Sequence, residues 1–258
     1  MSDLKLFNLN TKKLIKTKSL QILEMQALIE SFSEELLEIN IIASNYRISR
    51  GTEIIPTLGY DGNYNLVIIE YRNNRFGKII NKGLVLIDYI KENISEFKML
   101  IGSVINNDVA KLINYQPRLI IIGNDFVKYD EYAIKQMLGQ IELIKIQGYG
   151  NNHILLEKIY QNTNLDHRQF KYSFTSPSQE KLYHLVNEYL LSLGDEVIEV
   201  GYQNYCYYRK IKTFMYLLFN DGLECRVLLN GEYKSYQINN EKDFEKIKTK
   251  IENSYEQN

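Results

Sequence analysis

The sequence predicts an α/β protein: a three-layer core with a mixed sheet, followed by a small α+β domain. Its 258 residues are more than one typical domain needs and suit two. Two apolar runs, Leu66 to Ile69 and Leu119 to Ile122, do not alternate with polar residues. Such runs are typical of strands that helices cover on both faces. A polar stretch over residues 161–177 separates this part from a shorter second one.

Composition narrows the class of protein. Apolar residues make up 45% of the chain and charged residues 24%, which is ordinary for a globular protein. The net charge of −1, from 31 basic and 32 acidic residues, excludes a general polycation but leaves room for a local basic patch. Residues 1–18 hold no apolar signal segment, and no run approaches the ~20 apolar residues that span a bilayer. We therefore expect a cytoplasmic protein without a membrane partner.

The first domain, residues 1–160, begins with an expected amphipathic helix over residues 19–38 that Ser19 caps. Strands are expected at 41–48, 54–60 and 66–71, with a turn at 61–63. A basic loop at 72–78 leads into a helix to about Ile90 and further helical sequence to Leu112. A buried strand at 119–122, a short helix at 130–138 and a hairpin of 141–146 with 154–159 complete the order α-β-β-β-α-β-α-β-β.

The second domain, residues 178–258, follows the expected linker of residues 161–177. A helix over 178–193 ends at Gly194, a residue common at helix ends. Four short strands are expected next, and Asn230-Gly231 is a strong signal for a tight hairpin. A closing helix is expected over 241–255. The two cysteines, Cys206 and Cys225, lack the paired spacing of a zinc site and are interpreted as buried free thiols in a reducing compartment.

The segment from Thr52 to Leu86 carries the most specific pattern. It reads TEIIPTLGYDGNYNLVIIEYRNNRFGKIINKGLVL. Its TLG, the following Asp61, the VIIEY strand and the later GL resemble the PD-(D/E)XK nuclease superfamily, in particular its Mrr-like, restriction-endonuclease-like branch. The helix that precedes them and the order of elements fit the same superfamily. The second domain, from FTSPSQEKLYHLVNEYLLSLGDEV onward, is similar to a domain of unknown function that is fused to such proteins.

The resemblance implies a metal site. In that family two acidic residues hold Mg²⁺ or Mn²⁺, which generates hydroxide from bound water. Glu70 matches the second acid, and Glu30 matches a glutamate of the first helix. Pro56, however, stands where the family has the first aspartate, and it offers no side-chain oxygen. Arg72 stands in place of the family's lysine and Lys82 in place of its glutamine, so the resemblance implies a degenerate site.

Two other acids are candidates for a migrated metal ligand. Asp61 lies in the hairpin turn, where forming the turn before Gly62 is the favoured interpretation. Glu53 lies three residues before Pro56, so strand alternation points it to the opposite face unless a bulge at Pro56 reverses it. The candidate metal ligands are therefore Glu70, Glu53 and Asp61.

Basic residues border the expected cleft, and aromatic residues lie among them. Arg47, Arg72, Arg75, Lys78 and Lys82 are the candidate nucleic-acid contacts, because cations there would neutralise backbone phosphates. A solvated basic loop that nearby acids balance is the alternative. His153, His167 and His184 show no metal spacing. The tyrosines at 202, 205, 207 and 208 favour a half-buried strand over base stacking.

The leading hypothesis is a nuclease-fold protein with an impaired site, Glu70, Glu30 and Arg72, that binds DNA or RNA without a cofactor. A bacterial restriction or phage-defence setting follows from the resemblance alone. One alternative is an active Mg²⁺- or Mn²⁺-dependent endonuclease with a migrated acid. Another is a non-catalytic scaffold that binds a protein partner through the second domain. A homodimer is a further expectation.

Overall fold

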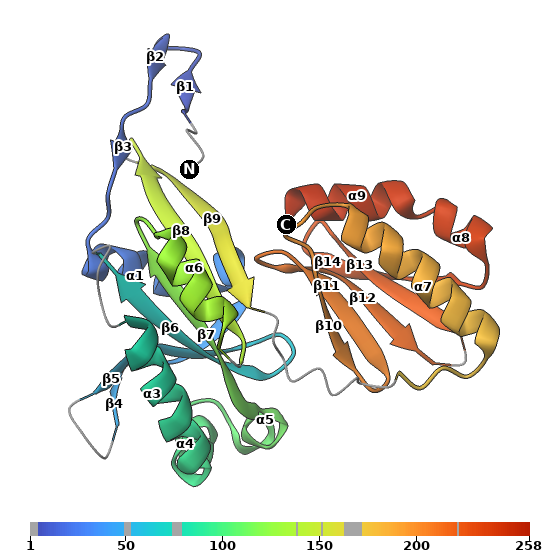
Figure 1. Cartoon of the computed structure of the whole chain (residues 1–258), viewed down its shortest axis with the longest axis horizontal. Coiled ribbons are helices and arrows are strands. Elements are labelled where there is room, and N and C mark those ends of the chain that lie inside the picture. The colour runs from blue at the N-terminus through green and yellow to red at the C-terminus, as the bar shows by residue number, and fades with distance from the viewer. Residues whose placement is uncertain are drawn as a thin grey trace. The chain divides into compact units, whose positions relative to one another are not determined.

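The computed structural model describes residues 5–48, 53–73, 79–137, 139–150, 152–162, 172–220 and 222–258. The chain divides into two compact units, Met1–Asp166 and His167–Asn258, and each is described by itself (Figure 1). Both mix helices with strands, as the sequence predicts. The expected linker starts too early, because residues 161 and 162 still belong to strand β9 (His153–Asn162). At its other end, Pro177 already begins helix α7 (Pro177–Ser192).

A mixed seven-stranded sheet forms the centre of unit 1. Its order is β3-β8-β7-β6-β5-β4, and β9 pairs with β8. Strands β6, β7 and β8 are parallel to one another, and the remaining pairs are antiparallel. The bounds of these strands are β3 (Thr17–Lys18), β4 (Ile39–Arg47), β5 (Ile54–Asp61), β6 (Asn65–Arg72), β7 (Asn114–Gly123) and β8 (Ile141–Tyr149). A two-residue pair, β1 (Phe7–Asn8) and β2 (Lys13–Leu14), forms a separate hairpin.

Helices cover both faces of this sheet, which gives three layers. Helix α1 (Ile22–Ser31) lies against β5 and β6, and α2 (Ser33–Leu37) lies against β4. Helix α3 (Ile79–Glu92) lies against β6 and β7, and it is followed by α4 (Ile94–Val104) and α5 (Asn107–Leu112). Helix α6 (Lys128–Lys135) adds Ile134 to the same apolar cluster as α3. The parallel strands β6 and β7 are apolar on both sides because each side meets a helical layer.

The first helix differs from the expectation. Residues 19–38 do not form one helix that Ser19 caps; the helix starts at Ile22, stops at Phe32 and resumes as α2. A residue far away in the sequence sets the start of α1: the Asn124 side chain accepts from Leu20 N at 2.9 Å and donates to Leu20 O at 2.8 Å. Because the N–H and the carbonyl of Leu20 both bond to Asn124, they do not take part in helical hydrogen bonds.

Strand β5 leaves its neighbour β6 at Pro56. The β5–β6 ladder ends at the pair Thr57–Ile69, whereas the β4–β5 ladder continues to the pair Arg47–Ile54. Proline has no backbone N–H to donate, so it fits a position where a ladder ends. The irregularity of the β4–β5 pairing lies between Ile41 and Ala43, so the described pairing has no bulge at Pro56.

Unit 2 is a five-stranded antiparallel meander with helices packed on it. The strands follow in chain order as β10 (Ile198–Tyr202), β11 (Tyr205–Arg209), β12 (Thr213–Phe219), β13 (Leu223–Leu229) and β14 (Glu232–Ile238). The sequence predicts four of these strands and one closing helix; the structure has a fifth strand, and α8 (Glu241–Glu245) is separate from α9 (Lys248–Gln257). The predicted hairpin is confirmed, because Asn230 and Gly231 both have positive φ, 54° and 82°.

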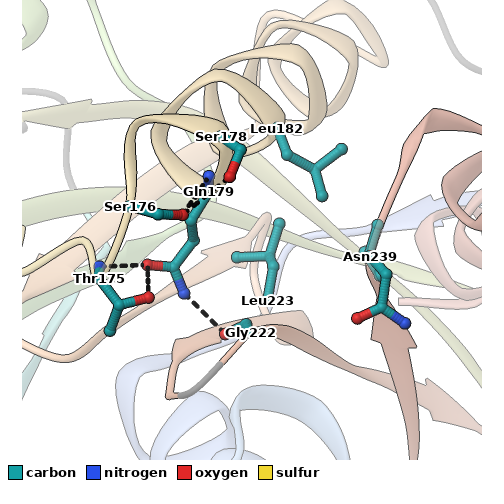
Figure 2. Close-up of a pocket in the computed structure, with 9 residues that line it drawn as sticks. Thr175, Ser176, Ser178, Gln179, Leu182, Gly222, Leu223 and Asn239 are labelled. Atoms are coloured by element: carbon teal, nitrogen blue, oxygen red, sulfur yellow. Dashed lines mark hydrogen bonds between the residues drawn. The ribbon is translucent and has the colours of Figure 1, made fainter.

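A small hollow of about 180 Å³ lies where α7 begins (Figure 2). Gln179 occupies its wall, and its side-chain oxygen accepts from Thr175 N at 2.7 Å. Its side-chain nitrogen donates to Gly222 O at 2.7 Å and to Asn220 O at 3.2 Å. Gln179 thereby ties the start of α7 to the turn between β12 and β13. The described residues include no helix with the length and apolar character that a membrane crossing requires.

Candidate functional site

Glu70 lies near the carboxyl end of β6, and its side chain is buried. Lys82, in the first turn of α3, approaches it from the helix layer. The Lys82 Nζ atom lies 2.8 Å from Oε1 of Glu70 and donates to Oε2 at 3.1 Å. One ammonium group therefore contacts both oxygens of the carboxylate.

The environment of Glu70 raises its pKa to about 7. Burial is the main cause, since it disfavours the charged carboxylate; Lys82 opposes the rise, and the charge of Glu53 adds to it. Near neutral pH, Glu70 is therefore present in both protonation states. The electrostatic effect of Glu53 also shows that this second acid lies within range of the site.

Glu30 is already bound by neighbouring side chains. It accepts hydrogen bonds from the Thr57 hydroxyl and from Gln26 Nε2, the latter at 3.0 Å. The Gln26 amide also donates to the backbone oxygen of Pro56 at 2.9 Å. Thr57 Oγ1 lies 3.0 Å from the hydroxyl of Tyr71. The one oxygen that Pro56 offers, its carbonyl, is thus already an acceptor within the fold.

Tyr71 shows that the two glutamates share one neighbourhood. Burial raises the pKa of its phenol, Thr57 lowers it, and the charges of Glu30 and Glu70 both raise it further. The structure therefore brings Glu30 and Glu70 near one side chain, as the family resemblance implies for the helix and strand acids.

Arg72 does not lie open in a cleft. Its guanidinium is buried, forms an ion pair with Asp130 of α6 at 2.9 Å and lies over the ring of Phe126 at 5.3 Å. Asp130 also accepts from Val127 N at 2.9 Å. The structure therefore places Arg72 between β6 and α6, away from a position that phosphate could reach directly.

Asp61 lies at the other end of β5 from Pro56. It accepts from the backbone N–H groups of Asn63 and Asn65 at 2.9 and 3.0 Å, which is the behaviour of a turn former. It also pairs with Arg118, whose Nη2 lies 2.9 Å from the buried Glu142. Asp61 is thus held in a buried charge cluster that is separate from Glu70.

The basic residues fall into two groups. Arg47 is exposed at the end of β4, and the side chain of Lys82 is 30% exposed although it pairs with Glu70. Arg50, Arg75, Phe76 and Lys78 lie outside the described residues. Among the candidate nucleic-acid contacts predicted from the sequence, Arg47 and Lys82 are therefore the described residues that remain available for a phosphate.

A cluster of amides at the same end of the sheet was not predicted from the sequence. Asn73 directly follows β6 and donates to Gln21 Oε1 at 2.8 Å. Asn124 directly follows β7 and donates to Asn73 Oδ1 at 3.2 Å. The carboxyl ends of parallel strands are where α/β sheets place ligands. The signal that could have revealed the cluster is an asparagine just after each of two buried strands.

The donor set does not match a divalent-metal site. Mg²⁺ binds proteins through one or two carboxylates whose oxygens are open to it, and waters complete its coordination. Here the Glu70 oxygens face an ammonium group, the Glu30 carboxylate accepts from Thr57 and Gln26, and Asp61 pairs with Arg118. Across the described ranges, no three His, Cys, Asp or Glu side chains are grouped so that they could hold a metal ion.

The cysteines and tyrosines of unit 2 have structural surroundings. Cys206 and Cys225 are free and buried, as predicted. Tyr208 is buried and donates to Asn187 Oδ1 at 2.9 Å. The rings of Tyr202 and Tyr205 stack on each other at 4.6 Å.

The three histidines lie in different parts of the chain. His153 borders a groove of unit 1, and His184 lies in α7 of unit 2 with its ring 5.1 Å from that of Tyr183. His167 lies outside the described residues.

Comparison with family models and with curated protein sequences gives no match. Among solved structures, the chain is similar to a protein in a structure titled as an EndoMS–dsDNA2 complex. The sequence identity is 18%, the TM-score is 0.29, and the match covers 43% of this chain and 40% of that one. At that TM-score the likeness carries no functional argument.

Proposed function

We propose that unit 1 is a nucleic-acid-binding module of nuclease-like architecture that holds backbone phosphates without a catalytic metal ion. The observation that carries this proposal is the ammonium of Lys82 on both oxygens of Glu70, at 2.8 and 3.1 Å. The class of ligand rests on the resemblance of residues 52–86 to the PD-(D/E)XK superfamily. The restriction or phage-defence setting rests on that resemblance alone.

The Lys82 ammonium group balances the charge of Glu70 as a metal ion would, but it cannot perform the chemistry of a metal ion. A bound divalent metal lowers the pKa of a coordinated water and thereby generates hydroxide. An ammonium group donates hydrogen bonds and has no open coordination position. Pro56 adds no side-chain oxygen opposite Glu70, so a dication would lose a ligand there as well. Binding without hydrolysis is the outcome that this donor set favours.

Phosphate binding is supported by the groups at this end of the sheet. Lys82 remains partly exposed, and Arg47 is exposed at the end of β4. The Asn73 amide, which donates one of its two N–H groups to Gln21, adds a neutral donor at the carboxyl end of β6. Lysine, arginine and amide groups are the usual partners of phosphate oxygens, and they position a duplex without reading its sequence.

A metal-dependent endonuclease is the second candidate, because the charge of Glu53 reaches Glu70. In that case Lys82 would turn away from Glu70, and Glu53 would supply the carboxylate that Pro56 lacks. This candidate requires cleavage that depends on added Mg²⁺ or Mn²⁺ and on Glu70.

Fluorescence anisotropy with labelled duplex DNA, single-stranded DNA and RNA tests the proposal. The expected result is binding in the presence of EDTA that weakens as salt rises. Lys82→Ala and Arg47→Ala should each weaken binding and reduce the salt slope by about 1. Lys91→Ala, an exposed lysine in the last turn of the same helix, is the matched control and should leave the slope unchanged.

Two results would overturn the proposal. One is binding that EDTA abolishes. The other is cleavage with Mg²⁺ or Mn²⁺ that Glu70→Gln abolishes, which would establish the endonuclease instead.

A further inference from the structure

The hairpin of β1 and β2 exposes several large apolar side chains to solvent. Phe7 pairs with Leu14 across the hairpin, and these two side chains are 52% and 59% exposed. Leu9, near the turn, is 83% exposed. A two-stranded hairpin is marginal by itself in water, and an exposed apolar patch marks a binding surface. In Figure 1 this hairpin extends beyond the sheet from β3.

An apolar groove of about 450 Å³ lies at the base of this hairpin, between α1–α2 and the β8–β9 hairpin. Phe32, at the break between α1 and α2, is 53% exposed and forms part of its wall. The other apolar lining residues are Leu20, Leu28, Leu36 and Ile154. The same helix break that departs from the expected single helix therefore exposes a ring beside a groove.

The two surfaces carry opposite charges. Four lysines lie on or beside the hairpin, and all of them are exposed: Lys5, Lys12, Lys13 and Lys16. Glu35 and Lys18 line the groove, but Lys18 already pairs with Glu24 at 2.9 Å. Glu34 is exposed next to Glu35 in the first turn of α2, so the unpaired charge beside the groove is acidic. The hairpin and the groove are thus complementary in two ways: both expose apolar side chains, and the lysines of the hairpin have the opposite charge to the glutamates beside the groove.

Backbone pairing holds the segment between the hairpin and the groove. Thr17 and Lys18 pair with Tyr149 and Gly148 of β8. The Lys16 carbonyl accepts from Gly150 N at 3.0 Å. These bonds hold the chain where it leaves the groove, and the hairpin extends away from the sheet at that point (Figure 1). The hairpin of a second copy can enter the groove with all of these bonds intact.

We propose that two copies of this chain exchange their β1–β2 hairpins, each placing Phe7, Leu9 and Leu14 in the Phe32 groove of the other. The same two surfaces on each copy produce a closed twofold dimer with two identical contacts. This inference is independent of the proposed nucleic-acid binding, since none of its residues belongs to the site around Glu70.

Light scattering on the full chain over a range of concentrations tests the proposal. The wild type should be a dimer that dissociates on dilution. Phe7→Asp/Leu9→Asp in the hairpin, and separately Phe32→Asp in the groove, should shift the dimer to monomer by at least tenfold in dissociation constant. Met99→Asp, an equally exposed apolar residue of α4, is the control and should remain dimeric. Circular dichroism checks that each variant is folded.

A mixture of the two monomeric variants distinguishes hairpin exchange from other ways in which two copies could associate. The hairpin variant keeps an intact groove, and the groove variant keeps an intact hairpin, so together they retain one complete contact. The mixture should form a heterodimer, weaker than the wild type, while neither variant associates alone. A monomeric wild type at 100 µM or above (roughly the range where a weak contact is detectable), or two variants that stay dimeric, would overturn the proposal.

Discussion

Lys82 of α3 lies directly against Glu70 of β6, so that a single ammonium group contacts both oxygens of a buried carboxylate. Because α3 packs across β6 and β7, its first turn is the part of the helix layer that meets the carboxyl end of β6. The pair joins two elements that a basic loop separates in the sequence. The pair lies near the point where the β5–β6 ladder ends, one residue beyond the last pair Thr57–Ile69.

Removing the ammonium and restoring an acid should create a metal site. We expect Pro56→Asp/Lys82→Gln to bind one Mn²⁺ per chain in isothermal titration calorimetry, since the carboxylate of Glu70 is then open and a second oxygen ligand is present. Pro56→Asp alone should bind at least tenfold more weakly, because Lys82 still occupies Glu70. Equal Mn²⁺ affinity of the single and the double variant would show that Lys82 does not block the site.

The raised pKa of Glu70 predicts how stability depends on pH. The folded carboxyl titrates near 7 and the unfolded one near 4.5, so the folded state binds more protons between these values. The free energy of unfolding should therefore fall as pH rises from about 4.5 to 7 and change little from this group above 7. The total contribution is on the order of 3 kcal/mol at most.

Glu70→Gln should remove this contribution, because an amide does not titrate in that range. Urea unfolding at pH 5, 6, 7 and 8 should show a flatter profile for the variant, with its largest gain over the wild type at pH 8. Parallel profiles for the two proteins would contradict the assignment. Glu92→Gln, which removes an exposed acid from the end of α3 in the same unit, serves as the control.

Replacing Arg72 should lower the free energy of unfolding, because its guanidinium is a buried ion-pair partner rather than an exposed phosphate contact. Arg72→Met leaves the Asp130 carboxylate without its ion pair in a largely buried position, where the loss of one partner costs about 3 kcal/mol. Urea unfolding should show this loss, and Arg72→Met/Asp130→Asn should recover part of it. If Arg72→Met weakened nucleic-acid binding with no loss of stability, the guanidinium would be a direct phosphate contact.

The two thiols should be inert in the folded protein. Burial raises the pKa of Cys225 to about 12 and also raises the pKa of Cys206 well above its ordinary value, so the reactive thiolate is scarce at pH 8. Ellman's reagent should titrate no thiol within minutes in buffer and two per chain in guanidinium chloride. A rapid reaction of one thiol in the native protein would show that unit 2 opens around β11 or β13.

The central strands of unit 1 could be predicted from the sequence because strands that are buried on both faces appear as continuous apolar runs. The runs at 66–69 and 119–122 are apolar on both faces, and the structure places them in adjacent parallel strands between two helical layers. The start of α1 at Ile22 was not predictable in this way. It depends on Asn124, which lies more than a hundred residues from Leu20 and holds the backbone of Leu20 outside the helix.

The proximity of Glu30, Glu70 and Lys82 was expected from the family resemblance, but their pairing was not. The structure places Glu70 against Lys82 and brings Glu30 near Tyr71, the residue that follows Glu70. The sequence could not show that Lys82 rests on Glu70, or that Arg72 turns to Asp130 on α6, because both partners lie on elements whose docking is a tertiary property. For the same reason Asp61 was a candidate ligand in the sequence, whereas in the structure Arg118 is its partner.

The glycine at position 59 is required by the close approach of β4 and β5. A Cβ atom there would lie 2.7 Å from the carbonyl oxygen of Asn40 in the neighbouring strand, so any larger residue would push β4 and β5 apart. At Gly83 a Cβ atom would instead meet the side chain of Leu119, so α3 and β7 would have to separate or Leu119 would have to repack. The two glycines therefore record how closely these elements approach each other, independently of any chemistry at Glu70.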